Sequence, residues 1–336
     1  MVGLRLFSVF SLLIGTFLSG NAWAAATANG TNGADTISVN ACDTSCGGDG
    51  VQDFTVVVNG GTPSIHLDET DLTVNGLGGN DTLVLNIPAS NNAAWGVNVT
   101  VNGGAGDDTL KIQGSGDISA NVTYDGGDDF DVLEMSNSST ANNSHYDMGA
   151  DNSSGTVTTQ YASSRVFNLS YTNIEPVIDC TLAVTLTVMG TNADNAVNYT
   201  AGPGNTCPPT GLVSVDGFET IEFGNKTNLI INGNAGSDTF NLNNPATPLG
   251  LTSITIQGQD PTASDTLIIN GTLNTMDTIV YTPTLGSPDG GTVTGAQPVP
   301  VTFLTTERLI VNGQRGQDTI TVNGTVNGDT LTHVPG

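Results

Sequence analysis

The chain has 336 residues, of which 32 are acidic and 6 are basic, and its formal net charge is −26 at pH 7. Such a surface repels nucleic acids and anionic membranes and attracts divalent cations, so we expect no nucleic-acid partner. Hydrophobic residues make up 37% of the chain and occur in short β-branched alternations, which a disordered tail does not need. The composition therefore predicts a folded, acidic protein.

Residues 1–24 have the pattern of an export signal. Arg5 gives the positively charged start, Leu6–Leu18 form an apolar run, and Ala22-Trp23-Ala24 is a small-residue cleavage motif. The alternative is an uncleaved membrane anchor, which needs about 20 apolar residues, and this run is shorter. No second stretch is long enough to span a membrane. We therefore expect a mature protein that starts at Ala25 and is secreted or held at the cell surface.

Four cysteines in an exported chain favour disulfides over a metal cluster. Cys42 and Cys46 are close in sequence and suit a small loop, which leaves Cys180 and Cys207 to pair across a Gly/Pro-rich segment. Three connectivities are possible, and we favour this one.

A phrase of about ten residues recurs along the chain: an apolar residue, Asn-Gly, and a few positions later Gly-x-Asp-Thr and another apolar residue. Asn-Gly tolerates left-handed backbone and turns the chain sharply. Asp favours an Asx-type turn, and the Thr that follows suits the start of a strand. No helical periodicity of useful length follows the signal. The copies lie at residues 29–37, 74–83, 101–110, 124–133, 231–240 and 311–320, with a stretched copy over 256–267.

The spacing of the phrase predicts the fold class. Asn75, Asn102 and Asp125 are separated by 27 and 23 residues, and Gln257 and Asn312 by 55, close to two such steps. Coils of about 23–28 residues, each with three short strands and three turns, are typical of a parallel β-helix or β-solenoid. We therefore expect an all-β solenoid whose turns stack at about 4.8 Å. The runner-up is an array of β-sandwiches, which would show turn signals about every 8–12 residues.

The sequence also contains a duplication that is longer than one coil. The matching segments are 85–90 with 242–247, 155–158 with 291–294, and 171–175 with 303–307. This duplication predicts a first solenoid unit over residues 25–186 and a second over 187–323. Residues 324–336 would then start a further coil or form a truncated end.

The segment Gly103-Gly104-Ala105-Gly106-Asp107-Asp108-Thr109-Leu110 resembles the Gly-Gly-x-Gly-x-Asp-x-apolar nonapeptide of the RTX, or hemolysin-type, calcium-binding repeat proteins. In that family the turn carbonyls and the Asp bind Ca²⁺ between stacked coils. The resemblance therefore implies that Asp108 is a calcium ligand, with Asp107 as its neighbour. The resemblance implies the same role of calcium ligand for the Asp at the same offset from the first glycine in the other copies: Asp35, Asp81, Asp131, Asp238 and Asp318.

This chain also departs from the RTX pattern. RTX repeats run in tandem every nine residues or so and usually lack a cleaved signal, whereas here the phrase comes about once per coil and a signal is present. The chain is also similar to large secreted bacterial repeat proteins of the Val-Asn-Gly-x-x-Gly-x-Asp-Thr type, which are often interpreted as surface or adhesin-like proteins.

Stacked aspartates raise the question of how their charges are neutralised. Two carboxylates about 4.8 Å apart repel by roughly 0.9 kcal/mol in water, and a calcium ion between the turns would relieve this. The alternative is that each Asp hydrogen-bonds its own turn and points into solvent. We expect calcium as the cofactor.

These patterns favour a secreted structural or adhesive surface repeat protein over an enzyme. We expect as its partners divalent cations and an extracellular glycan, a surface protein or further copies of itself. The alternative is a polysaccharide-acting parallel β-helix enzyme, a lyase or hydrolase, which needs clustered basic residues or a distinct acid pair. Ice binding would need a Thr-x-Thr column at a fixed place in every coil, and none is evident. The basic residues of the mature chain are scattered: Lys111, Arg165, Lys226, Arg308 and Arg315.

Overall fold

The structure is a computed structural model that describes residues 24–42, 46–47, 52–88, 95–259 and 264–325. These residues form two large β-sheets and no α-helix. Apart from Ala24, the predicted signal segment 1–24 lies outside the described residues, as does 326–336. Within the described ranges, no helix is long and apolar enough to cross a membrane.

Sheet A has 14 strands. In spatial order they are β1 (Ala24–Asn29), β5 (Glu69–Gly78), β7 (Asn98–Ala105), β9 (Asn121–Asp128), β13 (Val166–Thr172), β12 (Gly155–Tyr161), β11 (Ala141–Met148), β15 (Ala183–Met189), β19 (Lys226–Asn232), β21 (Ser253–Gln257), β25 (Val301–Leu304), β24 (Gly291–Thr294), β23 (Thr278–Pro283) and β27 (Thr319–Val322).

Sheet B has 13 strands. In spatial order they are β26 (Arg308–Asn312), β22 (Thr266–Asn270), β20 (Thr239–Asn243), β16 (Ala196–Ala201), β17 (Gly211–Val215), β18 (Ile221–Phe223), β14 (Val177–Asp179), β10 (Val132–Asn137), β8 (Thr109–Gly114), β6 (Thr82–Ile87), β2 (Thr36–Ala41), β3 (Phe54–Val58) and β4 (Ser64–His66).

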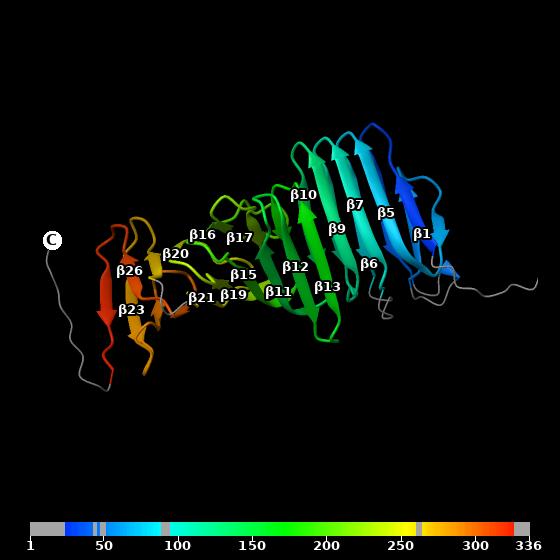
Figure 1. The fold of residues 1–336 in the computed structure, drawn as a ribbon. Coiled ribbons are helices and arrows are strands. Elements are labelled where there is room, and N and C mark those ends of the chain that lie inside the picture. The colour runs from blue at the N-terminus through cyan, green and yellow to red at the C-terminus, as the bar shows by residue number, and fades with distance from the viewer. Residues whose placement is uncertain (1–23, 43–45, 48–51, 89–94, 260–263, 326–336) are drawn as a thin grey trace, which may run out of the picture.

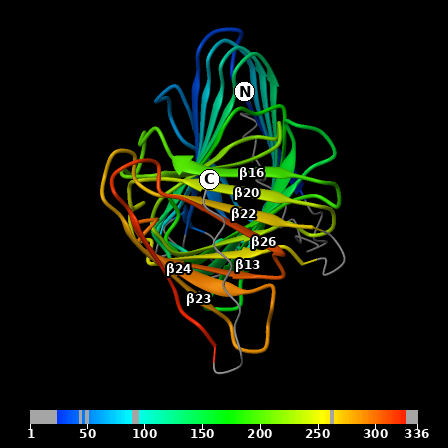
Figure 2. The ribbon, with the colours of Figure 1, turned by 90° about the vertical axis from the view of Figure 1, so that its left-hand side faces the viewer.

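The chain winds between these sheets as a β-solenoid, which confirms the predicted fold class. Each simple coil places one strand in sheet A and the next in sheet B, and equivalent strands of successive coils pair in parallel. In sheet A, Thr73 pairs with Thr100 and Thr100 with Thr123, which are the predicted steps of 27 and 23 residues. Figure 1 shows the strands of sheet A from β1 to β13 side by side, and Figure 2 views the stack from the end that carries β26 and β23.

The expectation of three strands per coil was wrong. The simple coils have two strands, and on the returning side the described residues contribute one isolated bridge, between Trp95 and Ile118. The physical reason is that alternating β-branched residues occur in two segments per coil, one on each side of the Asn-Gly phrase. The return segments lack such a run and form no third sheet.

Four antiparallel meanders of three strands interrupt the coils in the described part of the chain. They are β2–β3–β4 and β16–β17–β18 in sheet B, and β11–β12–β13 and β23–β24–β25 in sheet A. The interval from Gln257 to Asn312 was expected to hold two coils, and this expectation was wrong. Gln257 of sheet A pairs with Leu304 of β25, so one coil lengthened by a meander is complete at Leu304, and Asn312 lies further on, in β26 of sheet B.

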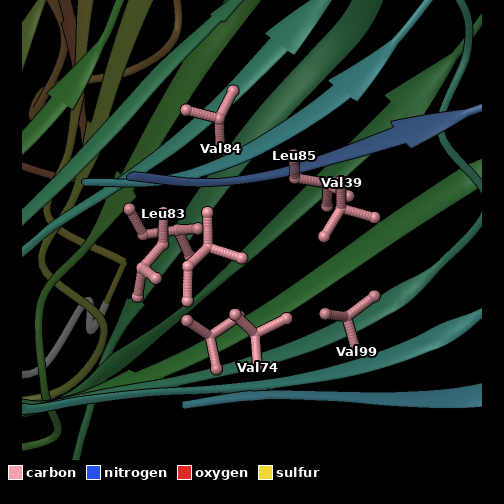
Figure 3. A pocket seen from close by; sticks show the side chains of 9 residues that line it. Val39, Val74, Leu83, Val84, Leu85 and Val99 are labelled. Atoms are coloured by element: carbon pink, nitrogen blue, oxygen red, sulfur yellow. The ribbon is translucent and has the colours of Figure 1, made fainter. Parts of the chain in front are cut away.

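The hydrophobic core fills the space between the sheets. Leu83 and Leu85 of β6 point inward and face Val74 and Val99 of sheet A, whereas Val84 lies on the opposite side of its strand (Figure 3). This alternation is what a strand with one buried face requires.

One continuous cluster of buried apolar side chains runs from Ala26 to Phe303. The predicted boundary between residues 186 and 187 falls within β15, and the core continues across it.

Both predicted disulfides are present. Cys42 bonds to Cys46 and Cys180 bonds to Cys207, each pair with its Cα atoms 5.9 Å apart. Cys207 lies in the loop between β16 and β17. The second disulfide therefore fixes this loop to the end of β14, where Cys180 and Ile178 form a small separate apolar cluster.

Candidate functional site

The aspartates of the repeated phrase form a ladder of hydrogen bonds between coils. The backbone N–H of Asp35 donates to Oδ1 of Asp81 at 2.7 Å, and that of Asp81 donates to Oδ1 of Asp108 at 2.7 Å. Asp108 in turn donates to Oδ1 of Asp131 at 2.8 Å. Each carboxylate therefore binds the coil before its own. We call this series, with Glu175 at its end, the first ladder.

A second ladder of the same kind follows further along the chain. Asn195 donates its backbone N–H to Oδ1 of Asp238, and Asp238 donates to Oδ1 of Asp265, both at 2.8 Å. Asp265 then donates to Oε2 of Glu307 at 2.7 Å. In the first ladder, Asp131 donates to Oε2 of Glu175 at 3.5 Å. Both ladders thus end at a glutamate.

The first members of the two ladders are held by equivalent side chains. Asp35 accepts a hydrogen bond from the Asn59 amide at 2.5 Å, and the Asn195 amide donates to Asp216 at 2.7 Å. Asn59 and Asp216 both have left-handed backbone, with φ of 51° and 46°. The acid and the amide have exchanged places between the two ladders while the contact is the same.

The ladder lies at the edge where strands of sheet A lead into strands of sheet B, and it is buried. Asp81, Asp108, Asp131 and Asp238 are 0–1% exposed. The alternative that each carboxylate points into solvent was therefore wrong, whereas a calcium ion between the stacked turns stays a prediction. The carboxylates are buried because each Asp directly precedes a strand of sheet B, and its side chain lies on the face of that strand that packs against the core.

Glycine makes this arrangement possible. A Cβ on Gly76 would come within 3.0 Å of both Oδ2 of Asp81 and the carbonyl oxygen of Gly103 in the next coil. Real Cβ atoms do not approach other atoms so closely. The first glycine of the phrase is therefore required for the close approach of the carboxylate and the neighbouring coil. The predicted sharp turn at Asn75-Gly76 was wrong, because both residues lie within β5, which continues to Gly78.

The second carboxylate oxygen has different surroundings along the ladder. In Asp35, Oδ2 accepts from the backbone N–H of Thr31 at 2.5 Å. In Asp81, Asp108, Asp131 and Asp238, Oδ2 is buried and has no hydrogen-bond partner in the described part of the chain. A buried carboxylate with one unsatisfied oxygen favours the protonated, neutral form.

The pKa values follow this difference. Burial, with a smaller contribution from neighbouring carboxylates, raises the pKa of Asp108 and Asp238 to about 6 and that of Asp131 to about 7. The pKa of Asp81 is also raised, chiefly by burial. By contrast, the backbone N–H of Thr31 holds the pKa of Asp35 below its usual value.

This ladder predicts that the folded protein becomes more stable as the pH falls from 8 to 5. An Asp in an unfolded chain has a pKa of about 3.9, so the folded state binds more protons than the unfolded state in this range. The stability that protonation adds is complete below about pH 4 and is lost as the pH rises through 6 and 7. Urea unfolding at several pH values measures it. An Asp108→Asn, Asp131→Asn double variant should show a flatter pH profile, and an equally steep profile would contradict the assignment.

Two of the seven predicted calcium ligands lie outside the ladders. Asp107 is exposed and accepts hydrogen bonds from Asn80 at 3.4 Å and from the backbone N–H of Phe130 at 3.2 Å. Asp318 follows β26 of sheet B and leads into sheet A, so it lies at the opposite edge, where it accepts from the backbone N–H of Asp277 at 3.0 Å. The structure therefore brings together Asp35, Asp81, Asp108 and Asp131, and separately places Asp238 in the second ladder.

The sequence reasoning missed other ladder members, although their signals were visible. Glu175 and Glu307 are the last residues of the matching segments 171–175 and 303–307, and Asp265 lies near the end of the stretched copy. Asn195 was missed because it is an amide. These positions could have been found by requiring that every coil supply a side-chain acceptor at this edge.

Calcium binding by these aspartates stays a prediction. Ca²⁺ takes six to eight oxygen ligands, including carboxylates, carbonyls and water. Beside Gly30, Gly76 and Gly103, the nearest atoms include two such oxygens, the carboxylate Oδ2 of the same copy and the carbonyl of the next coil's glycine. No group of three or more His, Cys, Asp or Glu side chains within the described ranges is arranged to hold a metal. We therefore derive no function through a calcium ion.

A second ordered feature lies on the outer face of sheet A. Thr27, Thr73, Thr100, Thr123 and Ser170 pair in register across β1, β5, β7, β9 and β13 and form one column of hydroxyls. Two polar columns flank it, and we call the three columns the Asn/Thr face. The flanking columns are Asn29, Asn75, Asn102, Asp125 and Thr172 on one side and Asp71, Asn98, Asn121 and Asn168 on the other.

The amides of the Asn/Thr face are hydrogen-bonded from coil to coil. Asn102 donates to Asn75 at 2.7 Å, Asn121 to Asn98 at 3.0 Å, and Asn168 to Asn121 at 3.1 Å. A column of single Thr residues that ends in Ser170 thus exists, which is not the Thr-x-Thr column that ice binding would need. Unequal coil lengths hide it, because Thr27 and Thr73 are separated by 46 residues and Thr100 and Thr123 by 23.

The fold defines this protein as a two-sheet parallel β-solenoid with antiparallel meanders. Comparisons of the chain with protein-family models, curated proteins and solved structures found no match.

Proposed function

We propose that this protein is an extracellular structural or adhesive repeat protein that binds a neutral glycan through the Asn/Thr face. The observation that carries the proposal is the registered array of hydroxyls and amides on an exposed sheet face. Asn98, Thr100, Asn121 and Thr123 are all exposed, and the side chains repeat at the strand spacing of about 4.8 Å.

The chemistry of the face favours a sugar polymer as the partner. Hydroxyls and amides both donate and accept hydrogen bonds, as sugar hydroxyls do. A repeating ligand can meet the same groups on successive coils, so weak contacts add together. The net charge of −26 repels acidic polymers and therefore favours a neutral glycan.

A shallow groove supports this location. It has a volume of about 320 Å³ and opens where β9, β13 and β12 meet. Thr123, Thr156, Thr158 and Asn168 are among the residues that line it. The groove lies at the transition from the parallel coils to the first meander of sheet A, where the regular array ends.

The proposal is tested with a Thr100→Lys, Thr123→Lys variant. We expect the mature wild-type protein to be retained on immobilised neutral polysaccharides such as cellulose or chitin, and the variant to bind at least tenfold more weakly, because two long cations interrupt the hydroxyl column. The matched control is Thr82→Lys, Thr109→Lys, which places the same change on sheet B.

Binding and melting curves of the three proteins are compared in calcium and in chelator. Retention on none of the polysaccharides, or equal binding by the Asn/Thr-face variant, would overturn the glycan proposal. Binding to a protein-coated surface, or concentration-dependent self-association, would point to the other expected partners. A melting temperature that falls in chelator would support the calcium prediction independently of glycan binding.

A further inference from the structure

Lys226 and Asp179 form an ion pair in the interior of the solenoid. Lys226 begins β19 in sheet A, and Asp179 ends β14 in sheet B, so the pair joins the two sheets across the core. Lys226 Nζ lies 3.0 Å from Asp179 Oδ1, and both side chains are 0% exposed. The ammonium also donates to the backbone carbonyls of Thr181 and Asp179.

The other lysine of the chain provides a comparison. Lys111 Nζ lies 2.9 Å from Glu134 Oε2, but the lysine side chain is 36% exposed. Solvent stabilises the charges of that pair, whereas the Lys226–Asp179 pair has no such stabilisation. Isolating two charges from water costs several kcal/mol per ion, and transfer of the proton from nitrogen to oxygen removes both charges.

Burial acts on the lysine of this pair and on a neighbouring tyrosine. Burial lowers the pKa of Lys226, against the opposing effect of the Asp179 carboxylate. Oδ2 of Asp179 is buried, and the hydroxyl of Tyr146 is buried beside this carboxylate. Burial and the adjacent Asp179 charge raise the pKa of Tyr146, so its phenol keeps its proton and can donate to the carboxyl oxygen.

We propose that Lys226 and Asp179 condense to an amide that covalently links sheet A to sheet B. The Nζ of the neutral lysine attacks Cγ of the protonated Asp179, and an N–C bond forms. The C–O bond to one carboxyl oxygen breaks, and this oxygen leaves as water with its own proton and one from the amine. The reaction needs no oxidant or reductant. Tyr146 donates a hydrogen bond to the oxygen on which negative charge develops.

The position of the pair explains what the link would do. Residues 179–226 contain β15 to β18 and the Cys180–Cys207 disulfide. An amide between Asp179 and Lys226 closes the same part of the chain with a second covalent bond, one that reduction does not break. Closing a loop restricts the unfolded chain and thereby stabilises the folded one.

Mass spectrometry of the reduced, full-length mature protein tests the proposal. We expect a mass lower by one water than the sequence requires, and a protease digest containing one branched peptide that joins Asp179 to Lys226. Lys226→Met should have the full mass, and Lys111→Met should keep the deficit of one water. The masses are read on denatured protein, so a variant that folds poorly still gives an answer.

Two results would overturn the cross-link. One is a wild-type protein of full mass that gives separate linear peptides for the two residues. The other is a one-water deficit that persists in Lys226→Met, which would assign the loss to succinimide formation at an Asp-Gly sequence. Either result leaves Lys226 and Asp179 as a buried ion pair.

Discussion

Gly103→Ala should prevent stable folding of the N-terminal coils, with a loss of at least about 3 kcal/mol. The new Cβ would lie 2.5 Å from Oδ2 of Asp108 and still closer to the carbonyl oxygen of Gly126 in the next coil. Neither atom can withdraw, because Asp108 is fixed by the backbone N–H of Asp81 and Gly126 belongs to β9. Urea unfolding followed by far-UV circular dichroism measures the loss.

The matched control for this prediction is Gly33→Ala. A Cβ on Gly33 would lie 3.8 Å from the Thr31 hydroxyl, with no other close neighbour, and Gly33 has no left-handed backbone requirement. This variant should unfold within about 0.5 kcal/mol of the wild type. If both glycine variants unfolded alike, the close approach of coils at the ladder would not be what requires glycine.

The second large effect concerns the carboxylate itself. Asp108→Ala should be less stable than Asp108→Asn by about 1–3 kcal/mol, because alanine leaves the buried N–H of Asp81 without its acceptor. Asparagine keeps the acceptor oxygen and carries no charge to bury. Asn195 starts the second ladder at the position that Asp35 has in the first, so a ladder position already accommodates an amide.

Measuring both Asp108 variants at pH 8 separates hydrogen bonding from charge. Asp108→Asn should equal or exceed the wild type in stability at this pH. The pKa of Asp108 is about 6, so at pH 8 the folded wild type carries a buried negative charge that asparagine lacks. Asp107→Asn, one residue earlier on the exposed side, should have little effect. Equal stability of Asp108→Ala and Asp108→Asn would exclude the ladder hydrogen bond as a stabilising contact.

The repeated phrase predicted much of the fold because its residues act locally. Asn75-Gly76 and Asn102-Gly103 recur near the ends of β5 and β7, and Asp-Thr marks where sheet B begins, so coil length could be read directly where copies follow one another. The closeness of Cys42 and Cys46 in sequence likewise predicted their disulfide, which left Cys180 and Cys207 to bond to each other. These features depend on few residues and little tertiary context.

The meanders and the inward direction of the aspartates could not be predicted in this way. Strands β11 and β12 have the same alternation as the strands of a coil, and whether a strand pairs in parallel or antiparallel is decided by what lies beside it. An Asp after a turn is ordinarily exposed. Asp108 is buried because the coils on either side supply its hydrogen-bond donor and cover it, and both coils are distant in sequence.

The placement of the four meanders balances the two sheets. A meander adds two strands to one sheet and none to the other, which displaces that sheet by about 10 Å along the stack. Two meanders fall in sheet B and two in sheet A, and they alternate between the sheets in chain order. The β3–β4 pair lies at the outer end of sheet B, the displacement by β11–β13 is cancelled by β16–β18, and the sheets finish at 14 and 13 strands. Removing the β11–β12 pair alone would leave sheet A two strands short against an unchanged sheet B, so every coil beyond it would have to shear to keep its core filled.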